Sequence, residues 1–307
     1  MSFGAKFLRA PGASPASAAG EPWGDRAVTL ELPGGPYLCS GLSPAQEESL
    51  RATFPGSVAL HAGAPAGEVP IRLLRLAADE FLAIDTRGWE YELDFAWAPA
   101  AVELAGIGLV GRLDWLPGLR GALWTCEDGG ERFPGTFENF FRVLVAYRLL
   151  DLGAAILHSA GVVKAGDAFL FLGRSGAGKT TVARLSQAHG GEVLSDDLNA
   201  LAIEDGRCMV RKLPFTGEIG DRRAVRPPVP LGGLLRLEKD TRDALLPISR
   251  AQAVACLLAC SPFVNVDPYR RERLEDVLLG LLAAGAPPAF ALRFALGGGF
   301  WSILGVK

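Results

Sequence analysis

The sequence of 307 residues predicts an α/β domain in its C-terminal part and a smaller α+β domain before it. One observation behind this is the unbroken apolar run from Ala168 to Leu172, typical of a strand buried on both faces of a parallel sheet. The next segment, Gly173 to Thr180, fits the pattern G-x-x-x-x-G-K-[ST]. A helical pattern then runs from Thr180 to His189 and ends at Gly190-Gly191. Strand, glycine-rich loop and helix stand in the order of a P-loop nucleotide-binding domain.

The residue types in this loop point to phosphate binding. Backbone N–H groups of such loops wrap the phosphates of a nucleotide, the lysine reaches the β and γ oxygens, and the next hydroxyl binds Mg²⁺. The helix N-terminus adds its dipole and its free N–H groups. The alternative is a glycine-rich turn without a ligand. The sequence favours ATP or GTP with Mg²⁺, bound by Gly173, Arg174, Ser175, Gly176, Ala177, Gly178, Lys179, Thr180 and Thr181.

Composition excludes several classes of function. The net charge is −3, the isoelectric point is near 5.8, and the basic residues are scattered, so we expect no binding to nucleic acid or to anionic membranes. The longest apolar stretch, Val277 to Ala286, is shorter than a membrane span. No secretory segment opens the chain. These features predict a soluble protein.

The five cysteines have no metal-ligand or disulfide-framework spacing. We therefore expect reduced thiols in a cytoplasmic protein. Cys256 and Cys260 lie one helical turn apart among apolar neighbours, which favours core packing over a shared ligand.

Residues 1–134 form the predicted α+β N-terminal domain, which has no chemical signature of its own but is a candidate for substrate recognition. Ala10 to Gly24 is rich in Ala, Pro, Ser and Gly, which predicts a flexible or irregular arm. Ser43 to Thr53 is a predicted helix with Ser43 as its cap and Pro44 at its first position. The predicted strands are Ala27–Leu32, Ile71–Leu76, and a hairpin of Phe81–Asp85 and Trp89–Leu93 that turns at Thr86-Arg87-Gly88.

Residues 135–307 form the predicted nucleotide-binding domain, with the boundary near Pro134-Gly135. A helix that begins at Thr136, runs from Phe137 to Leu152 and ends at Gly153 either opens this domain or bridges the two halves of the chain. The further predicted elements are a strand pair Ala155–His158 and Gly161–Lys164, a turn at Ala165-Gly166-Asp167, a strand Glu192–Leu194, and a hairpin from Leu201 to Val210.

Asp196 and Asp197 follow the strand after the loop helix, where parallel α/β sheets gather their ligands. Adjacent residues that leave a strand point to different sides, so one carboxylate can hold Mg²⁺ while the other accepts a substrate proton. The alternative is a single metal-binding aspartate with an incidental neighbour. His158 precedes the loop and by itself is more typical of a hydrogen-bonded core histidine. Neither His61 nor His189 has convergent neighbours in the sequence.

These residues resemble the C-terminal catalytic domain of HPr kinase/phosphorylase, whose fold is similar to that of ATP-dependent phosphoenolpyruvate carboxykinase. The resemblance rests on Leu157-His158-Ser159, on the loop, and on Asp196 and Asp197 at 17 and 18 positions after Lys179. It covers residues 158–201 well and the rest of the C-terminal half weakly. The resemblance implies ATP as the nucleotide, Asp197 as the base for an acceptor serine, and Thr180 with acidic residues as Mg²⁺ ligands. It also implies that His158 belongs to the active site, and it suggests a homo-oligomer.

The chain also departs from that family. Where the family has a metal-binding Glu and an Arg, this chain has residues 213–223, in which Glu218 is the counterpart of the acid and Arg222 or Arg223 that of the cation. Surface ion pairs explain Asp221-Arg222-Arg223 equally well. Arg293 and Arg270-Arg271 are further candidates for the arginine. Residues 1–134 do not match the family's N-terminal domain, so neither HPr as substrate nor the reverse reaction is implied. The chain resembles the divergent HPr-kinase-like proteins of bacterial peptide-modification pathways.

The motifs and the resemblance together are compatible with three alternative functions. The first is an ATP- and Mg²⁺-dependent kinase for a serine-type hydroxyl of a peptide or protein, such as a ribosomally made peptide, with Asp197 as base and Lys179 on the β and γ oxygens. The second changes the acceptor to a small molecule such as free serine. The third is a nucleotide-dependent peptide-binding module without transfer. Paired aspartates argue against the third, and an enclosed cavity would favour the second.

Overall fold

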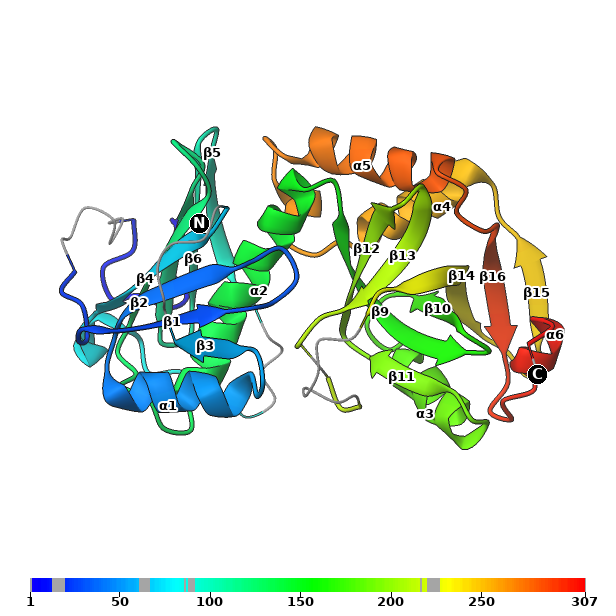
Figure 1. Cartoon of the computed structure of the whole chain (residues 1–307), viewed down its shortest axis with the longest axis horizontal. Helices are drawn as coiled ribbons and strands as arrows, with labels where there is room; N and C mark the ends of the chain where they lie inside the picture. The colour runs from blue at the N-terminus through cyan, green and yellow to red at the C-terminus, as the bar shows by residue number, and fades with distance from the viewer. Residues whose placement is uncertain are drawn as a thin grey trace. The chain divides into compact units, whose positions relative to one another are not determined.

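A computed structural model describes residues 2–12, 20–60, 67–85, 87, 92–215, 217–219 and 227–306. In this part of the chain the fold is mixed α/β, with two large sheets and few helices (Figure 1). The chain divides into two compact units, Met1–Val145 and Ala146–Lys307. The division falls inside helix α2 (Phe133–Asp151), whereas the sequence places the boundary near Pro134-Gly135.

The N-terminal unit is built on an eight-stranded sheet, counted over its described residues, with the order β3-β1-β2-β4-β8-β7-β6-β5. Its strands are β1 (Arg26–Leu30), β2 (Tyr37–Leu42), β3 (Val58–Leu60), β4 (Val69–Arg75), β5 (Asp94–Ala98), β6 (Ala101–Gly106), β7 (Leu109–Asp114) and β8 (Arg120–Thr125). The helical segments here are α1 (Pro44–Thr53), the short 3₁₀ helix η2 (Ala78–Glu80) and the start of α2. The predicted strands at 27–32 and 71–76 correspond to β1 and β4.

Helix α1 confirms its sequence prediction. The Ser43 hydroxyl accepts a hydrogen bond from Gln46 N at 3.1 Å, and the Gln46 side chain accepts one from Ser43 N at 3.1 Å. This reciprocal pair satisfies backbone donors that the first helical turn leaves open. Pro44 costs nothing at the first position, since its missing N–H has no partner there.

Helix α2 packs on the sheet of the N-terminal unit through glycines. A Cβ at Gly111 would lie 2.6 Å from the Phe140 ring, and one at Gly121 would lie 2.7 Å from Leu144, so the absence of side chains lets the helix approach β7 and β8. The helix starts at Phe133, ahead of the predicted Thr136, because Thr136 N already donates to the Arg132 carbonyl at 3.1 Å.

The predicted hairpin over residues 81–93 is wrong in the part that the structure describes. Residues 82–85 form no strand, and Phe81 makes only an isolated bridge with Leu8. Phe81 is buried in a cluster with Phe7 and Trp124, so its apolar character serves packing against the N-terminal segment. Thr86 and residues 88–91 lie outside the described residues.

The predicted irregular arm is only partly described, since residues 13–19 lie outside the described part. Its end contacts the sheet: Pro22 forms a bridge with Leu74, and Trp23 N donates to the Gly41 carbonyl at 2.9 Å.

The C-terminal unit holds a sheet with the order β10-β9-β12-β13-β14-β16-β15, in which β11 also pairs with β9. Strand β10 pairs with both β9 and β14, so β9, β12, β13, β14 and β10 close into a ring. The strands are β9 (Ala155–Lys164), β10 (Asp167–Leu172), β11 (Glu192–Ser195), β12 (Leu198–Glu204), β13 (Arg207–Lys212), β14 (Val229–Lys239), β15 (Ala244–Pro247) and β16 (Ala289–Phe294).

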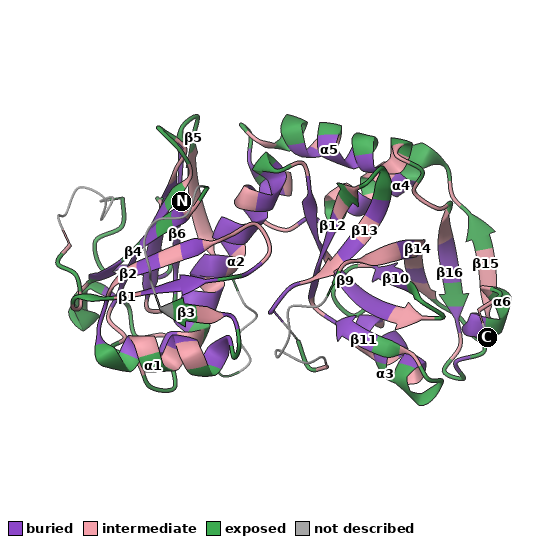
Figure 2. Ribbon diagram, in the orientation of Figure 1, coloured by how far each residue is buried: buried purple, intermediate pink, exposed green. Residues whose placement is uncertain are grey.

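The helical segments of this unit are the end of α2, α3 (Lys179–Ala188), α4 (Arg250–Ala259), η3 (Val264–Val266), α5 (Arg271–Ala283) and α6 (Phe300–Ile303). Figure 2 shows that β10 is buried along nearly its whole length. Phe171 on this strand packs edge-on against Trp301 of α6, with the ring centroids 5.9 Å apart. None of the helices in the described ranges is both long and apolar enough to cross a membrane.

Two sequence predictions about strands need correction here. Residues 155–164 form one continuous strand, β9, where the sequence predicted a pair of strands. The turn after it lies where the sequence predicts it, at Ala165 and Gly166, whose φ values of 53° and 90° suit a tight hairpin. Strand β10 is buried as predicted, but it is parallel only to β14 and antiparallel to β9.

Candidate active site

Strand β9 brings the candidate site residues together. It pairs antiparallel with β10 on one edge and with β11 and β12 on the other, so β10 and β11 run in the same direction. The register places the end of β10 at Ser159, the end of β11 at Gly161 and the start of β12 at His158. The segments that leave β10 and β11 therefore lie on either side of β9 at one position along it.

The segment that leaves β10 is the glycine loop (Gly173–Gly178). It turns back on itself, since Ala177 N donates to the Arg174 carbonyl at 3.1 Å. Gly176 and Gly178 have φ values of 75° and 104°, which disfavour any residue with a side chain. At Gly178 a Cβ would also lie 2.6 Å from the Phe294 ring. Helix α3 starts directly after it, so its first N–H groups face the loop.

Lys179 is buried at the start of α3. Its Nζ donates to the carbonyls of Gly173 at 3.0 Å and Arg174 at 3.3 Å, so the side chain lies across the open side of the loop. Burial lowers the pKa of Lys179 below its ordinary value, although the charges of Cys260, Asp197 and Asp196 partly oppose this. An ammonium group that is desolvated in this way favours an anionic ligand.

Thr180 and Asp196 form the next contact, between α3 and the end of β11. The Thr180 hydroxyl donates to Asp196 Oδ2 at 3.0 Å, and Asp196 Oδ1 accepts a hydrogen bond from Ile219 N at 3.0 Å. The segment over this carboxylate packs closely, because a Cβ at Gly217 would lie 2.8 Å from Asp196 Oδ1. A hydroxyl and a buried carboxylate side by side are the oxygen ligands that Mg²⁺ takes in nucleotide sites.

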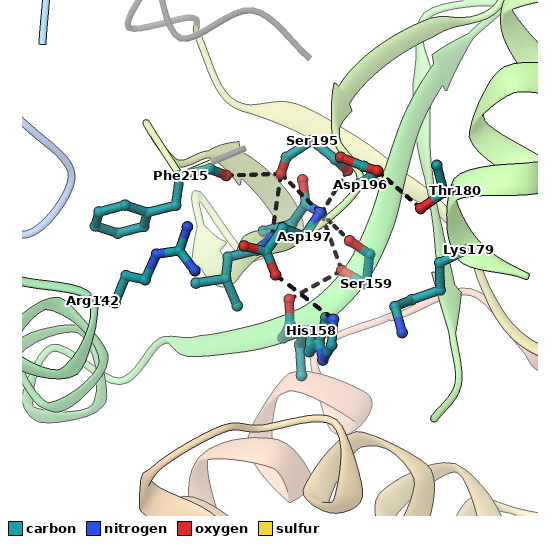
Figure 3. A network of polar contacts seen from close by, with 12 residues as sticks. Arg142, His158, Ser159, Lys179, Thr180, Ser195, Asp196, Asp197 and Phe215 are labelled. Carbon is teal, nitrogen blue, oxygen red and sulfur yellow. Dashed lines mark hydrogen bonds and ion pairs between the residues drawn. The ribbon is translucent and has the colours of Figure 1, made fainter. Parts of the chain in front are cut away.

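Asp197 points the other way, toward His158 on β9 (Figure 3). The distance from His158 Nε2 to Asp197 Oδ1 is 3.6 Å. The backbone holds both residues, because Ser159 N donates to the Asp197 carbonyl at 2.9 Å and His158 N donates to the Cys260 carbonyl at 2.7 Å. The two aspartates thus face different partners, as the sequence predicts for adjacent residues that leave a strand.

Two buried polar residues, Ser195 and Asn199, hold the backbone that points Asp196 and Asp197 in different directions. The Ser195 hydroxyl donates to the Phe215 carbonyl at 2.9 Å and accepts from Asp197 N at 3.1 Å. Asn199 Nδ2 donates to the Ser159 carbonyl at 2.9 Å, which ties β12 to β9. Gly161 makes room for this amide, since a Cβ there would lie 2.5 Å from Asn199 Oδ1.

Sequence reasoning missed Ser195 and Asn199. The only signal in the sequence for either residue was its position close to Asp196 and Asp197. Their role depends on partners that lie far away in the chain.

Glu218, the predicted third metal ligand, lies at the edge of the site. Its exposed carboxylate pairs with Arg184 of α3 at 2.5 Å. Over the described residues, no group of three or more His, Cys, Asp or Glu side chains could hold a metal ion. A metal here would therefore take Thr180 and Asp196 as its protein ligands, with Glu218 within the same cavity.

The candidate arginines do not join this group where the structure describes them. Arg293 pairs with Glu238 at 3.3 Å, and Arg271 pairs with Glu275 of its own helix at 3.0 Å. Arg270 lies 4.0 Å from Asp151. Asp221, Arg222 and Arg223 lie outside the described residues, as does His61.

A cavity of about 420 Å³, here called the loop cavity, unites most of the predicted residues. It is lined by Ser175, Gly176 and Gly178 of the glycine loop, the first turn of α3, His158, both aspartates and Glu218, whereas Gly173 and Arg174 line a second cavity. Lys239, at the end of β14, also lines it and was missed from the sequence. Strand β14 runs parallel to β10, so it ends at the same edge of the sheet as the strand that leads into the loop. Only the strand pairing reveals this, because Lys239 lies far from the loop in the sequence.

Of the two cysteines predicted to pack in the core, Cys260 is buried and Cys256 is half-buried. All five cysteines are free, but Cys256 and Cys260 line the second cavity beside the glycine loop. A hydrogen bond from Cys256, the Gly173 amide and the Lys179 charge hold the pKa of Cys260 below its ordinary value. The same pairing and burial raise the pKa of Cys256.

Comparisons with models of known protein families and with curated proteins find no match to this chain.

Proposed function

We propose that this chain is a kinase that transfers the γ-phosphoryl group of ATP to a serine-type hydroxyl, on a P-loop domain similar to that of HPr kinase/phosphorylase. One observation carries the proposal. Lys179, the Thr180–Asp196 pair and the Asp197–His158 pair all line the same cavity of about 420 Å³. A phosphate cradle, a metal ligand and a base are the groups that phosphoryl transfer requires.

The glycine loop and the start of α3 would bind the phosphates through backbone N–H groups. Lys179 would release the carbonyls of Gly173 and Arg174 and bind the β and γ oxygens instead. These negative oxygens would stabilise the charged ammonium group, which burial destabilises. Lys239 would supply a second positive charge at the cavity.

The Thr180 hydroxyl and the Asp196 carboxylate would hold Mg²⁺. They fit this ion, since Mg²⁺ in nucleotide sites is bound by one or two carboxylates together with phosphate oxygens and water. When bound, the ion would neutralise charge on the β and γ phosphates. Asp196 already lies against Thr180 at 3.0 Å, so the two ligands need little rearrangement.

Asp197 would act as the base. It accepts the proton of the acceptor hydroxyl as the hydroxyl oxygen bonds to the γ phosphorus, and the bond from that phosphorus to the β–γ bridging oxygen breaks. The products are a phosphate monoester and ADP. His158, 3.6 Å from Asp197 Oδ1, would orient the carboxylate toward the acceptor.

We propose a reducing, cytoplasmic environment for this reaction, because the five cysteines have no disulfide-framework spacing in the sequence.

The test compares wild type with Asp197→Asn. Each protein is incubated with ATP, Mg²⁺ and either serine-containing peptides or free serine, added phosphate is measured by mass spectrometry, and ATP affinity is measured by calorimetry. We expect transfer to fall at least about 10²-fold in Asp197→Asn, with ATP affinity nearly unchanged. Asp205→Asn, in the tight turn between β12 and β13, is the matched control.

Equal turnover of wild type and Asp197→Asn would remove the base assignment. A wild-type protein that does not bind ATP with Mg²⁺ would remove the whole proposal. Binding without transfer to any acceptor would favour the nucleotide-dependent binding module.

A further inference from the structure

The second cavity, here called the α4 cavity, has a volume of about 550 Å³. It lies between the first residues of the glycine loop (Gly173–Ser175), Arg236 and Leu237 of β14, and one face of α4 with its cap residue Cys260. Cavities of 300–1,000 Å³ hold compact organic ligands. The proposed function does not yet use this cavity.

The α4 cavity adjoins the loop cavity. His158 and Ser175 line both of them. His158 is also the residue that contacts Asp197, the proposed base. The His158 side chain would therefore lie between a molecule in the α4 cavity and the carboxylate of Asp197, the proposed base.

The position of Lys179 indicates which end of a nucleotide would face the α4 cavity. Its ammonium lies on the carbonyls of Gly173 and Arg174, and both of these residues line the α4 cavity. Lysines of such loops reach the β and γ phosphates. Thr180 and Thr181, in the first turn of α3 after the other end of the loop, line only the loop cavity. The α4 cavity would thus adjoin the terminal phosphate, and the nucleoside would extend away from it.

The lining is mostly apolar. Leu237, Ala255 and Ala259 line the α4 cavity together with the thiols of Cys256 and Cys260. Three further lining residues have long polar side chains, namely Arg174, Arg236 and Gln252, and Arg174 is exposed on the glycine loop. Arg236 pairs with Glu238 at 2.5 Å, and the Gln252 side chain accepts a hydrogen bond from Ser249 N at 2.8 Å. The apolar face formed by α4 and Leu237 favours an uncharged, apolar body, because a charged group on that face would lose its hydration without an ionic partner.

We propose that the α4 cavity binds the phosphoryl acceptor, and that the acceptor is a hydroxyl group carried on a compact, uncharged, mostly apolar body. This inference rests on the proposed kinase function and narrows its substrate class. Two sources share this chemistry: a free apolar alcohol, and a serine next to apolar residues in a peptide. In both cases the apolar body packs on α4 and Leu237, and the hydroxyl passes His158 to reach Asp197.

The first experiment uses defined probes with ATP and Mg²⁺. N-acetyl-leucyl-serine amide represents the peptide source, and cyclohexylmethanol represents the free alcohol. Free serine and N-acetyl-aspartyl-serine amide are their charged counterparts. We expect phosphate transfer to at least one apolar probe at a kcat/KM at least about tenfold above that of both charged probes. The apolar probe that reacts identifies the source.

The second experiment fills the cavity. Ala255→Phe adds a ring at an exposed position of α4 that lines the cavity, and Ala251→Phe adds the same ring at an exposed position of α4 that does not. We expect Ala255→Phe to lower kcat/KM for the apolar probe at least about tenfold while ATP affinity stays within twofold. Ala251→Phe should change neither quantity.

The outcomes separate this inference from the proposed function. A tenfold loss of ATP affinity in Ala255→Phe would assign the cavity to the nucleoside and overturn the inference. ATP binding by wild type with transfer only to charged probes, or to no apolar probe, would overturn it as well. Absence of ATP binding by wild type would instead remove the proposed function on which the inference rests.

Discussion

His158 Nε2 lies 3.6 Å from Asp197 Oδ1, and the two residues come from neighbouring segments of one sheet. The hydrogen bond from Ser159 N to the Asp197 carbonyl joins those segments at 2.9 Å. The contact therefore depends on the backbone pairing of β9 with the segment between β11 and β12. His158 thus lies beside Asp197, while Asp196 contacts Thr180.

The first prediction concerns His158. If it orients Asp197, His158→Asn should lower kcat for the acceptor that wild type phosphorylates on the order of 10- to 100-fold and leave ATP affinity unchanged. Initial rates of phosphorylated product and calorimetric ATP binding measure both effects. His189→Asn is the control, since His189 follows the end of α3, with its Nδ1 2.8 Å from the Leu185 carbonyl, and lines neither cavity. Equal kcat values in wild type and His158→Asn would contradict the orienting role.

The second prediction concerns Lys179. Replacement by methionine keeps the length of the side chain but removes the charge that would meet the β and γ oxygens. Since hydrogen bonds to charged groups contribute about 1.5–3 kcal/mol, ATP affinity should fall roughly 10- to 100-fold. Titration calorimetry with ATP and Mg²⁺ measures this. Lys6→Met in the N-terminal unit should bind ATP like wild type, and normal binding by Lys179→Met would argue against a nucleotide at the loop.

The third prediction separates two glycines of the loop. An alanine at Gly176 meets no atom within 4 Å but must adopt a φ of 75°, so Gly176→Ala should lower the free energy of unfolding by about 1–2 kcal/mol. Gly178→Ala adds a Cβ 2.6 Å from the Phe294 ring, so its loss should be larger by about 1–3 kcal/mol. Urea unfolding compares the two variants. An equal loss would mean that Phe294 moves aside without cost.

The fourth prediction concerns Ser195, which positions Asp197. Ser195→Ala leaves the Phe215 carbonyl and the Asp197 amide without this hydroxyl, which should lower the free energy of unfolding by about 1–3 kcal/mol. The kcat should fall while ATP affinity changes little, because the glycine loop is not affected. Ser302→Ala, at an exposed position of α6, is the matched control. A variant with lower stability but normal kcat would show that Ser195 has only a structural role.

The fifth prediction concerns the pH dependence of Cys260. Its thiol has a lowered pKa, and only the thiolate reacts with iodoacetamide, so alkylation should rise with pH and reach half its maximum below 8.5, the usual value for cysteine. Peptide mass spectrometry from pH 5 to 10 follows the reaction. Cys39 is fully buried, and burial raises its pKa, so it should remain unlabelled in the folded protein. A midpoint at or above 8.5 would contradict the lowering of this pKa by the Cys256 hydrogen bond, the Gly173 amide and Lys179.

Several features were predictable because their causes are local. Ser43 and Gln46 cap α1 within one turn, and the tight turn at Asp205-Gly206 joins β12 to β13 with φ values of 49° and 76°. The glycine loop and the start of α3 follow in the same way from neighbouring residues. In the residues that the structure describes, the predicted hairpin at 81–93 failed for the opposite reason, since Phe81 packs on residues near the N-terminus.

By itself, the sequence determined the loop between β10 and α3, the helix that follows it, and the presence of two acidic residues after the next strand. Those features depend on residues that are adjacent in the chain, where backbone freedom and hydrogen bonding act over a few positions. Only the tertiary structure decided that Asp196 contacts Thr180, that Asp197 contacts His158, and that Lys239 and Cys260 lie beside the loop. Strand pairing brings these residues together, and its register depends on burial and hydrogen bonding over the whole sheet.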